Sequence, residues 1–209
     1  EMFNFLTGYG RPAGYRKLLV SPTTMRESIL GEIEATVEAH RAGQEARIAL
    51  KMNALVDARC IQALYEASRA GVPVDLNVRG VCCLRPGVPG VSENIRVVSI
   101  VGRFLEHSRI YAFQRGEETR VLTGSADLMP RNLDSRVELV APIEDEGLRA
   151  ELLDVLESCF AENANAWELD ADGTWTRLVA PPGERRSVQE ELRARHSSRA
   201  GEHLAAAPG

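Results

Sequence analysis

Residues 17–78 alternate between short extended runs and helical segments, and this alternation constrains the fold more than any other feature of the chain. Lys17–Ser21, Arg47–Met52 and Val74–Val78 are each short enough and apolar enough to be strands. Residues 24–42 and 57–70, which lie between them, have apolar positions at helical spacing. A strand–helix–strand–helix–strand order with connections of this length is typical of crossover units. The first part of the chain therefore predicts an α/β fold.

Both predicted helices carry their own start and stop signals. Thr24 and Glu27 have the spacing of a capping box, and Gly43 follows the last periodic residue of the first helix. Asp57 is expected to cap the second helix, and Gly71 is expected to close it. These signals set the expected helix boundaries.

The rest of the chain is richer in strands. Four are expected, and Gly116 is expected to turn a hairpin between the middle two. They are Arg96–Val101, Arg109–Phe113, Arg120–Thr123 and Arg136–Val140. Apolar residues at helical spacing predict a helix at about 146–161, and Trp167–Leu178 is expected to form a hairpin around Asp172-Gly173. The whole pattern predicts a mixed β-sheet flanked by helices.

The chain divides into one expected folded unit and two flanking segments. Residues 1–16 are rich in Gly and Tyr and are expected to be a linker or surface loop. Residues 17–180 form the expected domain. Residues 181–209 are rich in Pro, Arg, Glu and Ala and are expected to be a flexible tail, in which Gln189–Arg195 can form a short helix.

Composition excludes several classes of protein. A hydrophobic fraction of 44% supports a sizeable core, and a net charge of −5 argues against a general nucleic-acid-binding role. The sequence contains no apolar run long enough to span a bilayer. The four cysteines show no CxxC or Cys/His zinc spacing, so we expect reduced, buried thiols in a cytosolic protein and no zinc site.

One histidine and two arginines stand at the ends of predicted strands. Arg79 directly follows the strand Val74–Val78, and open α/β sheets bind ligands at the carboxyl ends of their strands. His107 and Arg109 are expected to open another strand. Arginine binds phosphate oxygens through planar, bidentate donors, and histidine can carry a proton or a phosphoryl group near neutral pH. The pattern predicts a phosphate-handling site with His107 as its catalytic residue.

A second polar segment follows the glycine of Gly124-Ser125. Ser125 and Arg131 are candidates to bind phosphate with Arg79 and Arg109, while a carboxylate such as Asp127 or Asp134 can simply orient an arginine. The sequence has neither a GxxxxGK[ST] nor a GxGxxG motif, so any phosphate site is not a P-loop.

Several long segments resemble the C-terminal part of the long bacterial polyphosphate kinase, the type that autophosphorylates on histidine. They are Phe3–Gly8, Tyr15–Val20, Lys51–Asp57 and Arg79–Asp134, and the similarity covers roughly residues 2–180. The resemblance implies a half of the phospholipase D-like fold. It also implies reversible transfer of the terminal phosphate of ATP to inorganic polyphosphate, with Mg²⁺ as the cofactor.

The resemblance also implies roles for particular residues. His107 matches the second of two essential histidines, and the phosphorylated one lies upstream of Glu1. Arg79 matches an arginine that contacts nucleotide phosphate, and Arg109 stands where the wider superfamily has lysine. Leu128 and Ala112 replace common aromatic residues and are expected to be packing positions. No metal ligand can be carried over to this chain.

The implied partners are ATP or ADP, polyphosphate, and the upstream catalytic half of the same enzyme, in a homo-oligomer. Nucleic acid and an integral membrane segment are not expected. The implied location is cytoplasmic, with peripheral association at the membrane as an open alternative. Because one of the two histidines is missing, we expect little or no activity from this chain alone.

The sequence is compatible with two other functions. The chain could be a phospholipase D-like phosphodiesterase that pairs two copies of His107 across a homodimer. It could also be a non-catalytic module that binds polyphosphate or nucleotide and supports dimerisation.

Overall fold

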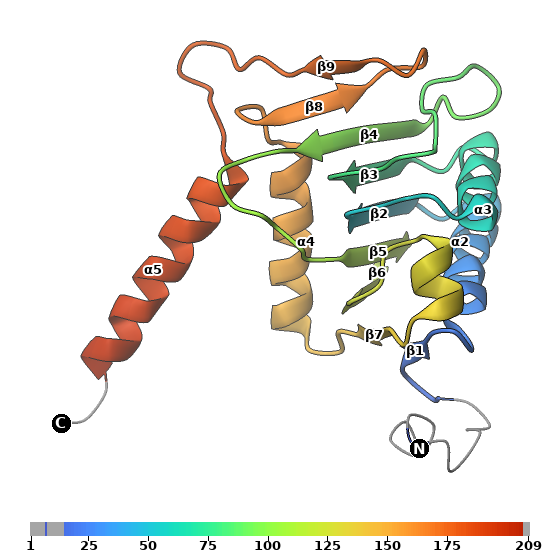
Figure 1. Ribbon diagram of the computed structural model, residues 1–209, viewed down its shortest axis with the longest axis horizontal. Coiled ribbons are helices and arrows are strands. Elements are labelled where there is room, and N and C mark those ends of the chain that lie inside the picture. Colours follow the sequence, from blue (N-terminus) through green and yellow to red (C-terminus); the bar gives the residue numbers. More distant parts are fainter. Residues whose placement is uncertain (1–6, 8–14, 207–209) are drawn as a thin grey trace.

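The computed structural model describes Thr7 and residues 15–206, with side chains described as far as Ser198. The described part contains a nine-stranded sheet in the order β1-β7-β6-β5-β2-β3-β4-β8-β9. The strands are β1 (Leu19–Val20), β2 (Ala46–Met52), β3 (Val74–Val78), β4 (Ile95–Ile100), β5 (Ile110–Arg115), β6 (Glu118–Gly124), β7 (Leu139–Pro142), β8 (Ala166–Leu169) and β9 (Trp175–Arg177). The helices are α2 (Met25–Arg41), α3 (Ala58–Arg69), α4 (Glu146–Phe160) and α5 (Val188–Ala206), with a π-helical turn η1 (Arg131–Ser135). The predicted mixed sheet flanked by helices is confirmed (Figure 1).

Three parallel strands form the centre of the sheet. β2 pairs in parallel with β3, and β3 pairs in parallel with β4. α3 connects β2 to β3, and Asp57 caps it as predicted, because its carboxylate accepts a hydrogen bond from the Cys60 amide at 3.0 Å. Parallel strands end at the same edge of a sheet, so the residues that follow β2 and β3 are brought side by side.

One edge of the sheet differs from the prediction. β1 pairs antiparallel with β7, and β5, β6 and β7 separate it from β2, so the first predicted crossover unit is wrong. Ser21 fixes β1 there: its hydroxyl donates to the Arg136 carbonyl at 2.7 Å and accepts from the Glu138 amide at 3.1 Å. The predicted hairpin is confirmed, since β5 and β6 pair across Gly116, where φ is 60°.

The start of α2 lies where the sequence predicted it, but the capping box does not form. Thr24 is the N-cap residue and makes no side-chain hydrogen bond to the first turn of α2. Its hydroxyl instead accepts from the Val20 amide at 3.3 Å. Glu27 forms an ion pair with Arg59 of α3 at 2.6 Å. The two side chains therefore tie α2 to its neighbours instead of capping it.

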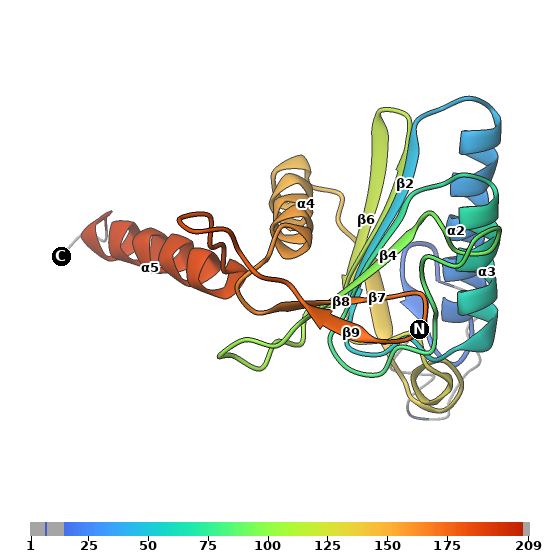
Figure 2. The ribbon, with the colours of Figure 1, turned by 90° about the horizontal axis from the view of Figure 1, so that it is seen from above.

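α2 and α3 cover one face of the sheet (Figures 1 and 2). Ile33 of α2 and Leu64 of α3 belong to the same buried cluster as Leu50 of β2 and Leu76 of β3, and each is at most 1% exposed. Successive strand residues point to opposite faces, so Ala49 faces the other way. The larger hydrophobic cluster of the protein therefore lies between these helices and the sheet.

α4 covers the opposite face (Figure 2). Leu156 and Phe160 of α4 cluster with Ala49, Val98 and Ala112 of the sheet. Ala112 is 3% exposed, so its predicted role as a packing position is confirmed.

The C-terminal segment is more helical than predicted. The sequence indicated a flexible tail with a short helix at Gln189–Arg195, whereas α5 runs from Val188 to Ala206. Val188 is buried in a small cluster with Ile100, and Leu192 packs against that cluster. Figures 1 and 2 show α5 extending away from the sheet. Apart from Thr7, Tyr15 and Arg16, the predicted loop at residues 1–16 lies outside the described residues.

The four cysteines are free thiols. Cys60 and Cys159 are buried, but Cys83 is exposed, so the prediction of buried thiols is wrong for that residue. Burial raises the pKa of Cys159 to about 12, which keeps it protonated and unreactive. None of the described helices combines the length and apolar character needed to cross a bilayer.

Gly124 is required by the close approach of β6 to β7. A Cβ atom at this position would lie 2.1 Å from the Leu139 carbonyl oxygen and 2.7 Å from the Val140 Cα. These are backbone atoms, so Gly124→Ala is expected to lower the free energy of unfolding by about 1–3 kcal/mol. Gly31→Ala, in open space on α2, is expected to raise it by about 0.5–1 kcal/mol. Urea unfolding of both variants tests the difference, and a neutral Gly124→Ala would contradict the packing described.

Candidate active site

Three of the residues predicted to handle phosphate, Arg79, His107 and Arg109, are linked at one edge of the sheet. The Asp127 carboxylate accepts hydrogen bonds from the Asn53 amide at 2.7 Å and from Arg109 Nε and Nη2 at 3.1 and 3.0 Å. The Asn53 side-chain oxygen accepts from Arg79 Nε at 2.8 Å. Arg109 Nη1 donates to the His107 carbonyl at 2.6 Å. One chain of contacts therefore runs from Arg79 to the backbone of His107.

The topology explains this convergence. β2 ends at Met52 and leads into Asn53, and β3 ends at Val78 and leads into Arg79. β5 runs antiparallel to β2, so its start lies at the same edge, with Ile110 opposite Lys51. The segment after β6 is held against the segment after β2 by hydrogen bonds from two amides to the Leu128 carbonyl, at 2.8 and 2.9 Å. Leu128 is 1% exposed, so its predicted packing role is also confirmed.

Arg109 and Asp127 form a largely buried ion pair. Their side chains are 16% and 9% exposed. Burial alone would lower the pKa of Arg109, but the hydrogen bonds and charge of Asp127 outweigh that effect and raise it. The structure thus confirms that Asp127 orients an arginine. Asp134 has a similar role, because it pairs with Arg26 of α2 at 2.5 Å.

His107 lies in the connection between β4 and β5, residues 101–109, which we call the His107 loop. β5 begins at Ile110, so His107 precedes the strand and does not open it. The residue is exposed, and its imidazole makes no hydrogen bond within the described part of the chain. Only its backbone is held, through the contact with Arg109. The imidazole is therefore free to meet a ligand or another protein surface.

Lys51 was not predicted to belong to the site. Its ammonium pairs with Glu106 at 2.5 Å and donates to the Ser108 hydroxyl at 3.0 Å, so it binds the residues on both sides of His107. The Lys51 side chain is only 7% exposed. Burial would raise the pKa of Glu106, but the Lys51 charge and the hydrogen bonds from Lys51 and Ser108 together hold it below the ordinary value. These contacts anchor the His107 loop to β2.

The Lys51–Glu106 pair predicts a pH dependence of stability. A folded-state pKa below the ordinary value of about 4.3 means that ionised Glu106 stabilises the fold above that pH. The stabilisation is lost as the pH falls through the lowered pKa. Wild type should therefore be more stable than Glu106→Gln at pH 7, and the gap should shrink below about pH 4.3. Urea unfolding across this range tests it, with the exposed Glu117→Gln as control. A gap that does not change with pH would contradict the pairing.

Arg79 has a charge that no carboxylate of the described residues compensates. Its side-chain partner is the neutral amide of Asn53, and its carbonyl accepts from the Ser99 hydroxyl at 3.1 Å. The side chain is half-buried. A positioned and uncompensated guanidinium is suited to bind an anion.

Ser125 and Arg131 lie on the connection from β6 to β7. The Ser125 hydroxyl donates to the Glu138 carboxylate and accepts from the Leu139 amide at 3.2 Å, so it holds this connection together. Asn132 also donates to Glu138. Arg131 is exposed and makes no side-chain hydrogen bond among the described residues. Phosphate binding by Ser125 and Arg131 stays a prediction.

The sequence did contain a signal for Lys51. It is a charged residue inside the buried strand β2, and a buried lysine is rare unless it is paired. Its partners on the His107 loop depend on the long-range pairing of β2 with β5, which spacing alone does not give. Spacing alone does not give the role of Asn53 either, because its partners Arg79 and Asp127 follow two different strands, β3 and β6.

The described residues do not offer a ready cation site. No group of three or more His, Cys, Asp or Glu side chains among them is arranged to hold a metal ion. The two carboxylates of the network, Glu106 and Asp127, are already paired with Lys51 and Arg109. The described residues therefore do not fit a metal centre of their own.

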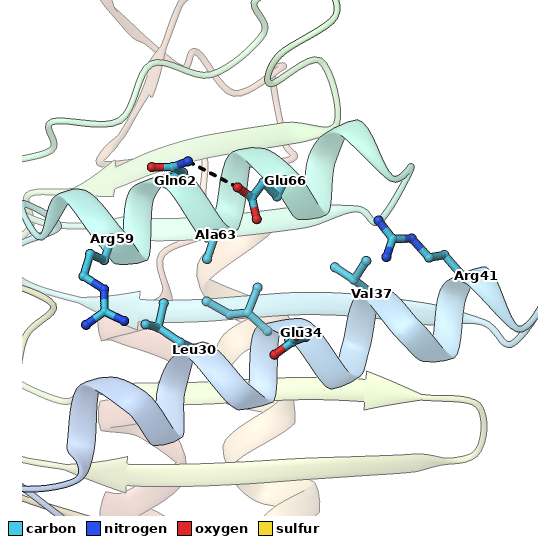
Figure 3. A pocket seen from close by; sticks show the side chains of 9 residues that line it. Leu30, Glu34, Val37, Arg41, Arg59, Gln62, Ala63 and Glu66 are labelled. Atoms are coloured by element: carbon cyan, nitrogen blue, oxygen red, sulfur yellow. Dashed lines mark hydrogen bonds between the residues drawn. The ribbon is translucent and has the colours of Figure 1, made fainter.

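A separate groove of about 350 Å³ lies between α2 and α3 (Figure 3). Leu30, Val37 and Ala63 line it, with Glu34 and Arg59 among the charged residues around them. None of the residues predicted for phosphate chemistry lines this groove. The candidate site is therefore the edge that carries His107 and not this groove.

Known structures first identify the fold. The chain is similar to a phospholipase D family member, Nuc from Salmonella typhimurium, with a TM-score of 0.52 and 15% identity over 77% of this chain. At this identity the similarity shows the fold alone, and the chain is thus a phospholipase D-like α/β domain. Polyphosphate kinase from Porphyromonas gingivalis is a much nearer structure, with a TM-score of 0.89 and 38% identity over 95% of this chain.

Sequence comparison gives the family. The model described as "Polyphosphate kinase C-terminal domain 2" matches residues 18–189. A polyphosphate kinase from Thermosynechococcus vestitus is 55% identical over 93% of the chain, and one from Streptomyces coelicolor is 47% identical over 92%. The chain belongs to the polyphosphate kinase C-terminal domain 2 family. It spans about a quarter of these relatives, covering 27% and 26% of their lengths.

Proposed function

We propose that this chain is the second catalytic half of a polyphosphate kinase, which transfers the terminal phosphate of ATP reversibly to inorganic polyphosphate. The observation that carries the proposal is the placement of His107. Its imidazole is exposed and unpartnered within the described residues, while Arg109 and Lys51 hold the loop around it. A catalytic group needs this combination of a free functional atom and a fixed backbone.

In this proposal the phosphorylated histidine belongs to the upstream half of the enzyme. Its nitrogen forms a bond to the terminal phosphorus of ATP as the bond to the bridging oxygen breaks, and ADP leaves with that electron pair. The terminal oxygen of polyphosphate then attacks the same phosphorus, and the N–P bond breaks. His107 faces this phosphorus and donates a proton or hydrogen bond to the oxygen that gains charge.

The arginines offset the negative charge of the two substrates. Arg79 has no carboxylate partner in the described part, so its guanidinium is available for a nucleotide phosphate. Arg109, Ser125 and Arg131 are proposed to contribute further phosphate contacts. Mg²⁺ is proposed to arrive with the nucleotide, where it would neutralise phosphate charge. In this proposal the arginines of this chain are its main phosphate-binding groups.

We also propose a cytoplasmic location and assembly with the upstream half in a homo-oligomer. The free cysteines support a reducing compartment. Peripheral association at the membrane stays an alternative proposal, and flotation with anionic vesicles would test it.

Reconstitution tests the proposed function directly. Conversion of ATP to polyphosphate with Mg²⁺ is measured for this chain alone, for the upstream portion of a relative alone, and for the mixture. We expect synthesis in the mixture only, because each component supplies one histidine. Synthesis by this chain alone would refute the division of the site between two halves.

A phospholipase D-like phosphodiesterase is the second candidate. The similarity in fold to Nuc and the exposed His107 favour it, since two copies could pair their histidines across a symmetric interface. Cleavage of a phosphodiester by this chain alone, lost in His107→Ala, would support it. If the chain binds polyphosphate and forms a stable oligomer without turnover in either assay, the non-catalytic module is favoured instead.

A further inference from the structure

A small hollow of about 100 Å³ lies between the His107 loop and the first turns of α5. Its lining includes Arg103, Arg185 and Arg193, and Glu190 is the one carboxylate among its described lining residues. We propose that this hollow binds a phosphate group of a linear inorganic polyphosphate chain whose reacting end lies at His107. The proposal rests on the proposed function and adds a second contact point for that substrate.

The charge around the hollow is only partly compensated. Arg103 and Arg193 have no carboxylate partner within the described residues, and Arg185 is 3.7 Å from Glu190. Neighbouring arginines are paired more closely: Arg186 with Glu191 at 3.3 Å and Arg195 with Asp154 at 2.6 Å. A chain with a net charge of −5 thus keeps excess positive charge at this point. Guanidinium groups in excess of carboxylates favour a polyanion.

The hollow has a fixed wall. The Gln189 side chain forms two hydrogen bonds with the Phe104 backbone, accepting from its amide at 2.9 Å and donating to its carbonyl at 2.8 Å. Gly102 leaves room for the Gln189 amide, which a Cβ atom at that position would displace. The Arg103 guanidinium lies 5.5 Å from the centre of the Phe104 ring. The contacts hold Arg103 beside the start of α5.

The start of α5 is itself anchored. The Glu162 carboxylate accepts a hydrogen bond from the Val188 amide at 2.6 Å, and Val188 is 4% exposed. Because Glu162 already occupies the first turn, arginine side chains rather than helix amides provide the anion site. Arg193 is four residues after Gln189 and three after Glu190, so all three share one face of α5. The arrangement therefore points Arg193 towards the same hollow.

Continuity with His107 identifies the ligand class. Arg103 precedes His107 by four residues, so their Cα atoms are at most about 14 Å apart. Linear polyphosphate is an extended chain that carries a negative charge on each unit. A chain of several units can therefore reach both positions. The triphosphate of a nucleotide bound at Arg79 would not need the hollow. The structure therefore favours a long inorganic chain as the ligand.

The test is binding of polyphosphate by this chain itself. Wild type, the double variant Arg103→Gln/Arg193→Gln and the control Arg41→Gln/Arg69→Gln are titrated with long-chain polyphosphate and with ATP. The control removes two arginine charges from exposed positions at the ends of α2 and α3, where neither side chain has an ion-pair partner among the described residues. We expect the double variant to bind polyphosphate at least about tenfold more weakly, with a salt slope lower by about 2. The control should stay within about twofold of wild type, and ATP binding should not change.

Three results would overturn the site. Equal weakening in both double variants would mean that only net charge matters. Unchanged polyphosphate binding in the double variant would show that the hollow does not bind polyphosphate. Parallel loss of ATP binding would assign the hollow to the nucleotide instead. Circular dichroism of each variant checks that the fold is intact.

Failure of the site and failure of the proposed function give different results. In the reconstituted enzyme the double variant should raise KM for polyphosphate and leave kcat unchanged, because neither His107 nor Arg79 lines the hollow. If synthesis depends on His107 but the double variant behaves like the control, the proposed function is supported and the polyphosphate site in the hollow is refuted. If Arg103 and Arg193 contribute to polyphosphate binding but no mixture synthesises polyphosphate, the site is supported and the proposed function is refuted.

Discussion

Replacing His107 with alanine is expected to reduce polyphosphate synthesis by the reconstituted enzyme by about 10²–10⁴-fold, the range for loss of a general acid or base. The free energy of unfolding should change by no more than about 0.5 kcal/mol, because the side chain is exposed and unpartnered in the described part of the chain. Arg109 holds the backbone carbonyl of His107, and alanine retains that carbonyl. A loss of activity would therefore come from the missing imidazole and not from unfolding.

Three further measurements make the His107 result specific. His107→Gln keeps a hydrogen-bonding side chain but cannot exchange a proton at neutral pH, so it should be nearly as inactive as His107→Ala. Added imidazole should restore part of the activity of His107→Ala, since the position is open to solvent. His196→Ala, exposed on α5, should behave as wild type. Normal synthesis by His107→Ala would exclude the catalytic role.

The elements that the sequence predicted well are those with local signals. Asp57 caps α3 through its own first turn, and Gly116 turns a hairpin between two adjacent strands. Each depends on residues a few positions apart, so spacing and turn chemistry are sufficient. The hydrophobic period of α4 likewise gave a helix at its observed position.

The elements that the sequence missed depend on distant partners. β1 is a two-residue strand whose place beside β7 is fixed by Ser21, Arg136 and Glu138. The full length of α5 was missed because the polar composition suggested a tail, although Ala, Glu and Arg are strong helix formers. Val188 and Leu192 supply its contact with the body. A helix anchored by so few apolar residues gives a weak amphipathic pattern.

The candidate site shows the same division. His107, Arg79 and Arg109 could be selected by residue type and by their positions at strand ends. Lys51 carried only the signal of a charge inside a buried strand. Its role, like that of Asn53, arises from the pairing of β2 with β5 and from the segment after β6. Those residues hold the predicted ones in place. Sequence reasoning thus found the groups suited to phosphate, and Asp127 as a carboxylate that orients an arginine, but it missed Lys51 and Asn53.

Asp127→Ala should be the most destabilising substitution in the network. It leaves the largely buried Arg109 guanidinium without its carboxylate and the Asn53 amide without its acceptor. Removing one partner of a buried ion pair costs about 3–5 kcal/mol. Asp127→Asn retains an oxygen for Asn53, so it should cost less. Urea unfolding measures both losses, and Glu27→Ala is the control, because the Glu27–Arg59 pair is exposed and should contribute less than about 1 kcal/mol.

A double-mutant cycle with Arg109→Met measures how much of the stability lost in Asp127→Ala comes from the interaction between Asp127 and Arg109. If Asp127 acts by compensating Arg109, the double variant should be less destabilised than the sum of the single variants, by about 0.5–3 kcal/mol. Asp127→Asn is then expected to lower synthesis even where the protein is folded, since Arg109 holds the His107 carbonyl. Additive losses in the cycle, together with full activity of Asp127→Asn, would show that Asp127 only packs the segment after β6. Coupled losses would show that the fold and the proposed catalytic histidine depend on one buried charge pair.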